Sequence, residues 1–149
     1  KYEFQIKLAD DKIYPCTINS PKIALGDISI PEYHNMSSAL VVSWGNLNET
    51  GTDYYLELGN EDKTQEIRLS SIQTKVGSYA IPSDVLALIS NGQRSDVLVT
   101  LRSVTSGKID PKFNGGSIQI IESVCKQVTL DLEDSSMGED KNYEAYLPK

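Results

Sequence analysis

The sequence predicts an all-β protein, a β-sandwich of about seven to nine short strands with one short helix. Three observations support this prediction. Apolar and polar residues alternate with a period of two in most of the apolar segments, as they do in strands with one buried face. Turns rich in Gly, Asn, Asp and Pro separate these segments at intervals of roughly 8–12 residues. Branched and aromatic residues dominate the apolar set, and they favour sheet over helix.

The stretch 38–58 is the expected centre of the sandwich, because it consists of a strand, a turn-rich loop and a second strand. Trp44, the single tryptophan, belongs to the apolar parity of the first strand, so we expect it in the core. In the second strand Tyr54 shares the apolar parity, which leaves Tyr55 on the outer face. The residues expected in the core are Leu40, Val42, Trp44, Leu56, Leu58, Leu69, Ile81, Leu86, Val97, Val99 and Leu101.

We expect three parts along the chain: added N-terminal strands at 1–20, the sandwich at 21–132 and an acidic tail at 133–149. The first part contains two strands, at 2–8 and 13–18, joined by a polar turn. The strand at 2–8 alternates strictly, so it is expected to be half-buried.

Two local features depart from simple alternation. Residues 83–92 have the pattern of a helix of about two turns, with Ser83 as its N-cap and Asn91 and Gly92 ending it in the left-handed conformation. The alternation shifts at 121–123, which predicts a bulge or a change of sheet.

The composition excludes several classes of function. The net charge is −7 and the isoelectric point is about 4.7, without a basic patch, so we expect no nucleic-acid partner. No apolar run reaches the length of a transmembrane segment. No nucleophile elbow, phosphate-binding glycine loop or pair of catalytic carboxylates is indicated by spacing. We therefore expect a protein that is not an enzyme and that binds no cofactor.

The residues that most often bind metals or form crosslinks are few. His34 is the single histidine, and we expect it in a solvent-exposed loop without a metal site around it. Cys16 and Cys125 lie far apart without metal-type spacing, and both have apolar neighbours. We expect two buried thiols, and the alternative is one disulfide that ties the first strands to the last.

Parts of the sequence resemble a known family. The strand at 39–44 with its closing Trp, and the strand at 54–58, resemble the second and third strands of fibronectin type III and immunoglobulin-like modules. The segments 78–89 and 95–104 are similar to the N-terminal domain of SusE/SusF-type outer-membrane lipoproteins of Bacteroidetes. Together the resemblance covers about 21–132.

The resemblance implies an immunoglobulin/fibronectin III-like sandwich at the extracellular face of the outer membrane or in the periplasm, with a lipid anchor upstream of residue 1. It also implies a role in glycan capture, although carbohydrate binding in that family belongs largely to later domains. The sequence departs from fibronectin modules in one respect, because the strand at 97–101 lacks the tyrosine of their tyrosine corner.

We therefore expect a non-catalytic cell-surface or periplasmic module that captures polysaccharide or a surface protein. Exposed aromatic and amide side chains are suited to such partners, and the loops at 46–53 and 106–116 would present them. The alternative is a structural, adhesion or assembly subunit that acts through protein–protein contacts, for example by pairing a free edge at 2–8 with a partner strand. The candidate ligand-binding residues are Tyr33, Tyr55, Asn46, Asn48 and Asp53.

Overall fold

The structure is a computed structural model that describes residues 1–22, 24–45, 47, 52–60, 64–69, 77–113 and 115–132. Candidate residues Asn46 and Asn48, and the acidic tail from 133 onward, lie outside the described residues. The elements are β1 (Tyr2–Lys7), β2 (Ile13–Ile18), β3 (Ile28–Ser29), β4 (Tyr33–Asn35), β5 (Leu40–Trp44), β6 (Thr52–Asn60), β7 (Glu66–Leu69), β8 (Ser78–Ile81), α1 (Ser83–Ser90), β9 (Ser95–Ser106), β10 (Lys108–Ile109) and β11 (Gln119–Asp131).

Two sheets form a sandwich. One has five strands in the order β4-β11-β9-β6-β7, and the other has three in the order β3-β5-β8. Their facing sides bury one contiguous apolar cluster to which both sheets and α1 contribute. The prediction of a mostly β, sandwich-like chain with one short helix is therefore confirmed, and an immunoglobulin-type strand order stays a prediction.

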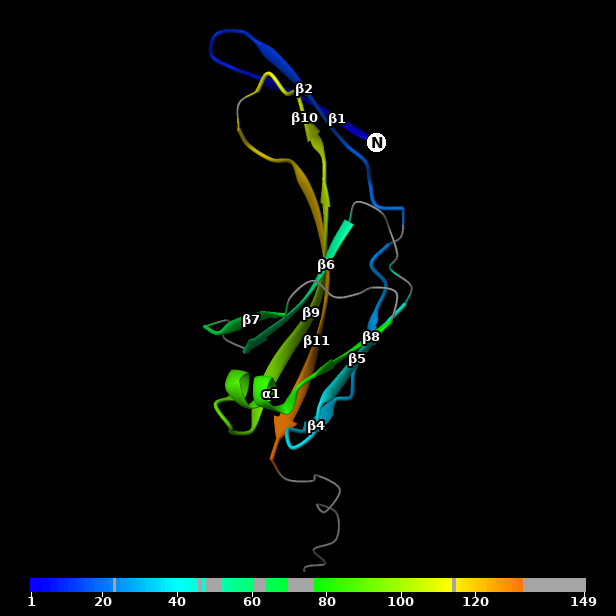
Figure 1. Ribbon diagram of the computed structural model, residues 1–149, viewed down its shortest axis with the longest axis vertical. Coiled ribbons are helices and arrows are strands. Elements are labelled where there is room, and N and C mark those ends of the chain that lie inside the picture. The colour runs from blue at the N-terminus through cyan, green and yellow to red at the C-terminus, as the bar shows by residue number, and fades with distance from the viewer. Residues whose placement is uncertain are drawn as a thin grey trace, which may run out of the picture.

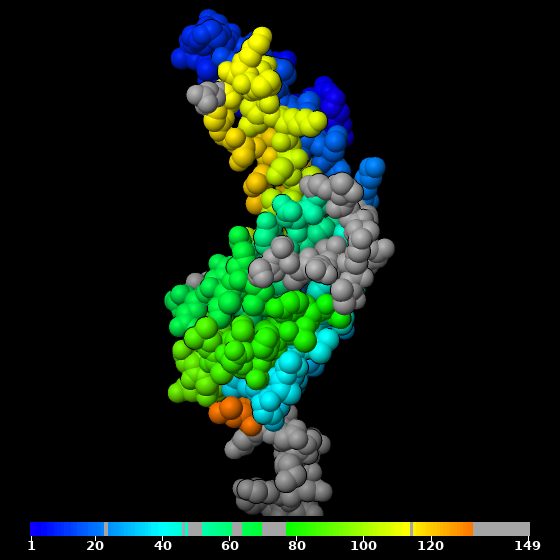
Figure 2. Space-filling view, viewed as in Figure 1, coloured from blue at the N-terminus to red at the C-terminus, as the bar shows by residue number. Residues whose placement is uncertain are grey.

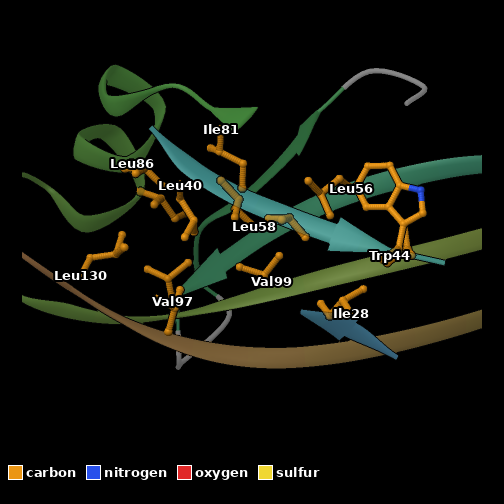
Figure 3. Packing of buried hydrophobic residues seen from close by; sticks show 14 of the residues in the cluster. Ile28, Leu40, Trp44, Leu56, Leu58, Ile81, Leu86, Val97, Val99 and Leu130 are labelled. Carbon is orange, nitrogen blue, oxygen red and sulfur yellow. The ribbon is translucent and has the colours of Figure 1, made fainter. Parts of the chain in front are cut away.

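The core lies between β5 on one side and β6 and β9 on the other (Figure 3). All of the residues that we expected in the core are buried except Leu69, which is half-buried and packs against the cluster. Trp44 is 8% exposed, and its ring lies beside Leu56 at one end of the cluster (Figure 3). The alternation in β6 is also confirmed, since Tyr54 is buried and Tyr55 is not.

Helix α1 begins one residue earlier than the sequence indicated. Its N-cap is Pro82, whose backbone is extended, so the prediction of Ser83 as N-cap is wrong. Ser83 already has helical geometry, and the backbone carbonyl of Pro82 accepts the first bonds, from Val85 and Leu86. The C-terminal end of α1 is as expected, because Asn91 has a φ of 54° in the left-handed region.

A third sheet, in the order β1-β2-β10, lies beyond the sandwich at one end of an elongated molecule (Figures 1 and 2). The long strands β9 and β11 reach it, since they pair with each other from Leu130 opposite Ser95 to Gln119 opposite Ser106. This register has no offset, so the bulge or change of sheet expected at 121–123 is wrong. The segment expected as a loop at 106–116 contains β10, which pairs with β2.

The strand at 2–8 forms as expected but is not half-buried. Tyr2 is 53% exposed and Phe4 is 46% exposed, and their rings stack on each other with centroids 6.5 Å apart. Cys16 and Ile18 of β2 lie on the same face and are buried. Gly107, between β9 and β10, approaches Ile18 so closely that an added Cβ would lie 2.8 Å from the Cβ of Ile18. The chain therefore covers this face at β2 but leaves Tyr2 and Phe4 exposed.

Candidate functional site

The outer face of the five-stranded sheet carries the most developed polar site. Because Leu56 and Leu58 of β6 point into the core, Tyr55, Glu57 and Gly59 point to the opposite face. The register places the side chains of β7 and β9 that share this face on both sides of them. The site is therefore held by three paired strands rather than by loops.

Glu57 is the centre of this site. It is 2% exposed, although it faces away from the core. Arg68 of β7 lies directly opposite and donates to Oε1 from Nε at 2.8 Å, with Nη2 at 2.7 Å. Arg102 of β9 approaches from the other side, with Nη2 2.9 Å from Oε2. Two guanidiniums thus compensate one buried carboxylate, which would be costly to bury alone.

A pocket of about 280 Å³ opens beside this ion pair. This volume lies just below the size range of small-molecule sites, roughly 300–1,000 Å³, and suits a small ligand. Its wall is formed by residues of β6, β7 and β9 and by the residue before β7, namely Glu57, Gly59, Gln65, Glu66, Leu98, Thr100 and Arg102.

Hydrogen-bonding capacity remains unused at the pocket wall. Nε of Arg102 is buried without a hydrogen-bond partner among the described residues. Oε2 of Glu57 is in the same situation, because its contact with Nη2 of Arg102 has the distance of an ion pair but not the geometry of a hydrogen bond. The residues that carry this donor and this acceptor, Arg102 and Glu57, both line the pocket, so a ligand that enters between their side chains and both donates and accepts can satisfy them.

Tyr55 supports the edge of the site. The guanidinium of Arg68 lies over its ring, 5.1 Å from the centroid, which holds Arg68 in the orientation that binds Glu57.

The thiol of Cys125 lies next to a pocket residue, since the hydroxyl of Thr100 donates to Sγ of Cys125 at 3.3 Å. The two cysteines are not bridged, and Cys125 is exposed, so the expectation of two buried thiols holds for Cys16 alone.

The structure does not gather the candidate residues that the sequence suggested. Tyr33 is 57% exposed on β4 and lies opposite Thr129, whose partner on β9 is Asp96. Tyr55 is opposite Arg102, six residues farther along β9. At about 3.3 Å per residue the two tyrosines are separated by about 20 Å along the strands.

The other candidates are not part of the pocket. Asp53, at the start of β6, is exposed and does not line it. His34, expected in an exposed loop, lies half-buried in β4 with Nε2 3.0 Å from the carbonyl of Ser38. The residues that sequence reasoning missed are Glu57, Arg68 and Arg102. In the sequence they are recognisable only as charged residues at outward-facing positions of predicted strands, and such residues are typical of any solvated face.

Comparison of the chain with protein-family models, with curated proteins and with solved structures gave no match. The resemblance to fibronectin type III and SusE/SusF-type modules therefore stays a prediction. No helix among the described residues is long and apolar enough to cross a membrane.

Proposed function

We propose that this protein is a non-catalytic binding module that captures a neutral, hydroxyl-rich ligand, a glycan residue, in the pocket beside Glu57 and Arg102. The observation that carries the proposal is that two residues lining the pocket, Glu57 and Arg102, have a buried acceptor and a buried donor atom without a hydrogen-bond partner among the described residues. A sugar hydroxyl donates one hydrogen bond and accepts others, so adjacent hydroxyls of one ring can satisfy both groups together.

The charge around the pocket favours a neutral ligand. Two carboxylates, Glu57 and Glu66, are balanced by the guanidiniums of Arg68 and Arg102. An anion would compete with Glu57 for the arginines, and a cation would compete with the arginines for Glu57. A neutral polyol disturbs neither pair. The exposed side of Leu98 adds an apolar surface for the C–H face of a sugar ring.

Placement at the cell surface or in the periplasm, as part of a SusE-like glycan-capture lipoprotein, is supported by the resemblance described above. A second candidate, an assembly or adhesion subunit, is supported by a different observation, the exposed aromatic residues of β1. The two functions use different ends of the molecule and are compatible.

The test is calorimetric titration with a panel of neutral and acidic oligosaccharides. We expect saturable binding of a neutral member. Gly59 offers a sharp variant, because it lines the pocket and a Cβ added there would meet only the Gln65 carbonyl, at an ordinary contact distance of 3.7 Å, so G59V should occupy part of the pocket without a clash at its Cβ. The matched control is G26V, since a Cβ at Gly26 meets nothing within 4 Å and Gly26 does not line the pocket.

G59V should weaken binding at least about tenfold, whereas G26V should leave it unchanged. Y55A should also weaken it, because Arg68 loses its support, and Y33A should have no effect. A blank across the panel would contradict the proposal, and so would binding that G59V does not change.

A further inference from the structure

The outer edge of β1 has a free row of backbone groups. Leu8 donates its N–H to Lys12, at 3.0 Å, so the even-numbered residues of β1 hydrogen-bond with β2. Backbone groups alternate in direction along a strand, and those of Glu3, Gln5 and Lys7 therefore point away from β2. Among the described residues, no strand pairs with this edge.

The side chains of β1 leave this edge unprotected on one face. Tyr2, Phe4 and Leu8 are exposed, and they lie on the same face as the buried residues of β2. Edge strands of monomeric proteins usually carry a proline, a bulge or an inward-pointing charge against strand addition. β1 has none of these on its apolar face, and its charged residues all belong to the other face.

We propose that β1 pairs antiparallel with the β1 strand of a second copy of this chain, across a twofold axis that passes through Gln5. In this register Glu3 of each copy lies opposite Lys7 of the other, so two opposite-charge pairs form on the polar face. On the apolar face Phe4 lies opposite Ile6, and Tyr2 lies opposite Leu8. The two three-stranded sheets become one continuous sheet of six strands.

Backbone geometry agrees with this register. Glu3, Gln5 and Lys7 have outward N–H and C=O groups, and in the proposed register they pair only with one another, which gives hydrogen-bonded pairs throughout. The apolar residues then occupy the non-hydrogen-bonded positions, where cross-strand side chains are closest.

Neighbouring registers are less favourable. A shift of two residues in one direction places Lys1 opposite Lys7 and Glu3 opposite Gln5. A shift in the other direction places Glu3 opposite Ala9 and Lys7 opposite Gln5. Both shifts lose the two opposite-charge pairs, and shifts by one residue would bring polar side chains opposite apolar ones.

The present partners of the charged residues do not prevent this pairing. Glu3 lies 2.8 Å from Lys1, and Lys7 lies 2.7 Å from Asp11, and all four side chains are more than half exposed. Exposed pairs of this kind contribute little to stability, so they can be exchanged or shared in the dimer. One short edge buries less area than a standard protein–protein interface, so the dimer should be weak, with a Kd above about 1 µM.

The test is sedimentation equilibrium of the full chain from micromolar to near-millimolar concentration. We expect a monomer–dimer equilibrium. E3K places a lysine opposite Lys7, and K7E places a glutamate opposite Glu3, so each single variant should raise the Kd at least about tenfold. The double variant E3K/K7E restores both pairs with reversed sign and should return the Kd to within about threefold of the original.

Q5P provides a second variant, because it removes an outward N–H while the bonds of Phe4 and Ile6 to β2 remain. It should abolish the dimer, and circular dichroism should show an unchanged fold. A chain that stays monomeric over the whole range would overturn the proposal and leave the edge to a different partner. A dimer that resists Q5P, or a double variant that does not recover, would also overturn it.

Discussion

Glu57 and Arg102 form an ion pair although they do not lie opposite each other in the sheet. In the register of β6 and β9, Glu57 faces Thr100 and Arg102 faces Tyr55, so the contact of 2.9 Å between Oε2 and Nη2 is diagonal. Arg68 lies directly opposite Glu57 on the other side. The buried carboxylate is thus compensated from two strands at once.

Removal of Arg102 should destabilise the fold more than removal of an exposed arginine. R102M leaves Glu57 buried with Arg68 as its one cationic partner in the described part of the chain, so we expect a loss of about 1–3 kcal/mol in the free energy of unfolding. R94M is the matched control, because Arg94 is exposed and its ion pair with Asp131 is long, at 3.6 Å. It should cost less than about 0.5 kcal/mol. If R102M and R94M had equal urea midpoints, the ion pair between Glu57 and Arg102 would contribute no more to stability than an exposed ion pair.

Truncation of Trp44 should be among the most damaging changes in the chain. W44A removes a large ring from between the two sheets, and such a cavity costs about 3–5 kcal/mol. V41A, on the same strand but on its exposed face, should cost less than about 1 kcal/mol. Urea denaturation with a constant m-value gives both numbers. A loss below about 1 kcal/mol for W44A would argue against its place in the core.

The sequence could predict the orientation of β5 and β6, because a period of two is a local property of the chain. Trp44 and Tyr54 could therefore be assigned to the core without knowledge of any strand partner. The site could not be predicted in this way. Glu57, Arg68 and Arg102 meet only because β7 and β9 pair with β6 in one register, and the residues themselves do not encode that register.

The two wrong predictions, a half-buried strand at β1 and a bulge or change of sheet at 121–123, have a related cause. Alternation indicates that a strand has an apolar face, but it does not indicate what covers that face. At β1 nothing among the described residues covers Tyr2 and Phe4. At 121–123 the pattern shifts because Ile121 occupies the outer parity of β11, like Cys125, and it is exposed there while the pairing with β9 continues without an offset.

The two thiols should differ sharply in reactivity. Cys125 is exposed on the outer face of the sheet, whereas Cys16 is buried beneath its neighbours, and the two are not bridged. A thiol reagent such as dithionitrobenzoate should modify one cysteine per native chain and two in denaturant, because access limits the reaction of a buried thiol. C125S should abolish the native reaction, and C16S should leave it unchanged. No reaction in denaturant without reductant would show that a disulfide exists.

Asp27 should titrate below the usual range of aspartate. Its hydrogen bond to Lys126, with Oδ2 2.8 Å from Nζ, lowers the pKa of the carboxyl, although exposure limits the effect. Because the pKa is lower in the folded state, the linked stabilisation is present above the unfolded pKa of Asp27, about 3.9, and is lost as the pH falls through the folded pKa. K126M should therefore raise the midpoint of Asp27 in a carboxyl NMR titration. It should reduce stability at neutral pH more than in acid, below the folded pKa. A midpoint that K126M does not change would show that the ion pair joining β11 to the start of β3 is absent in solution.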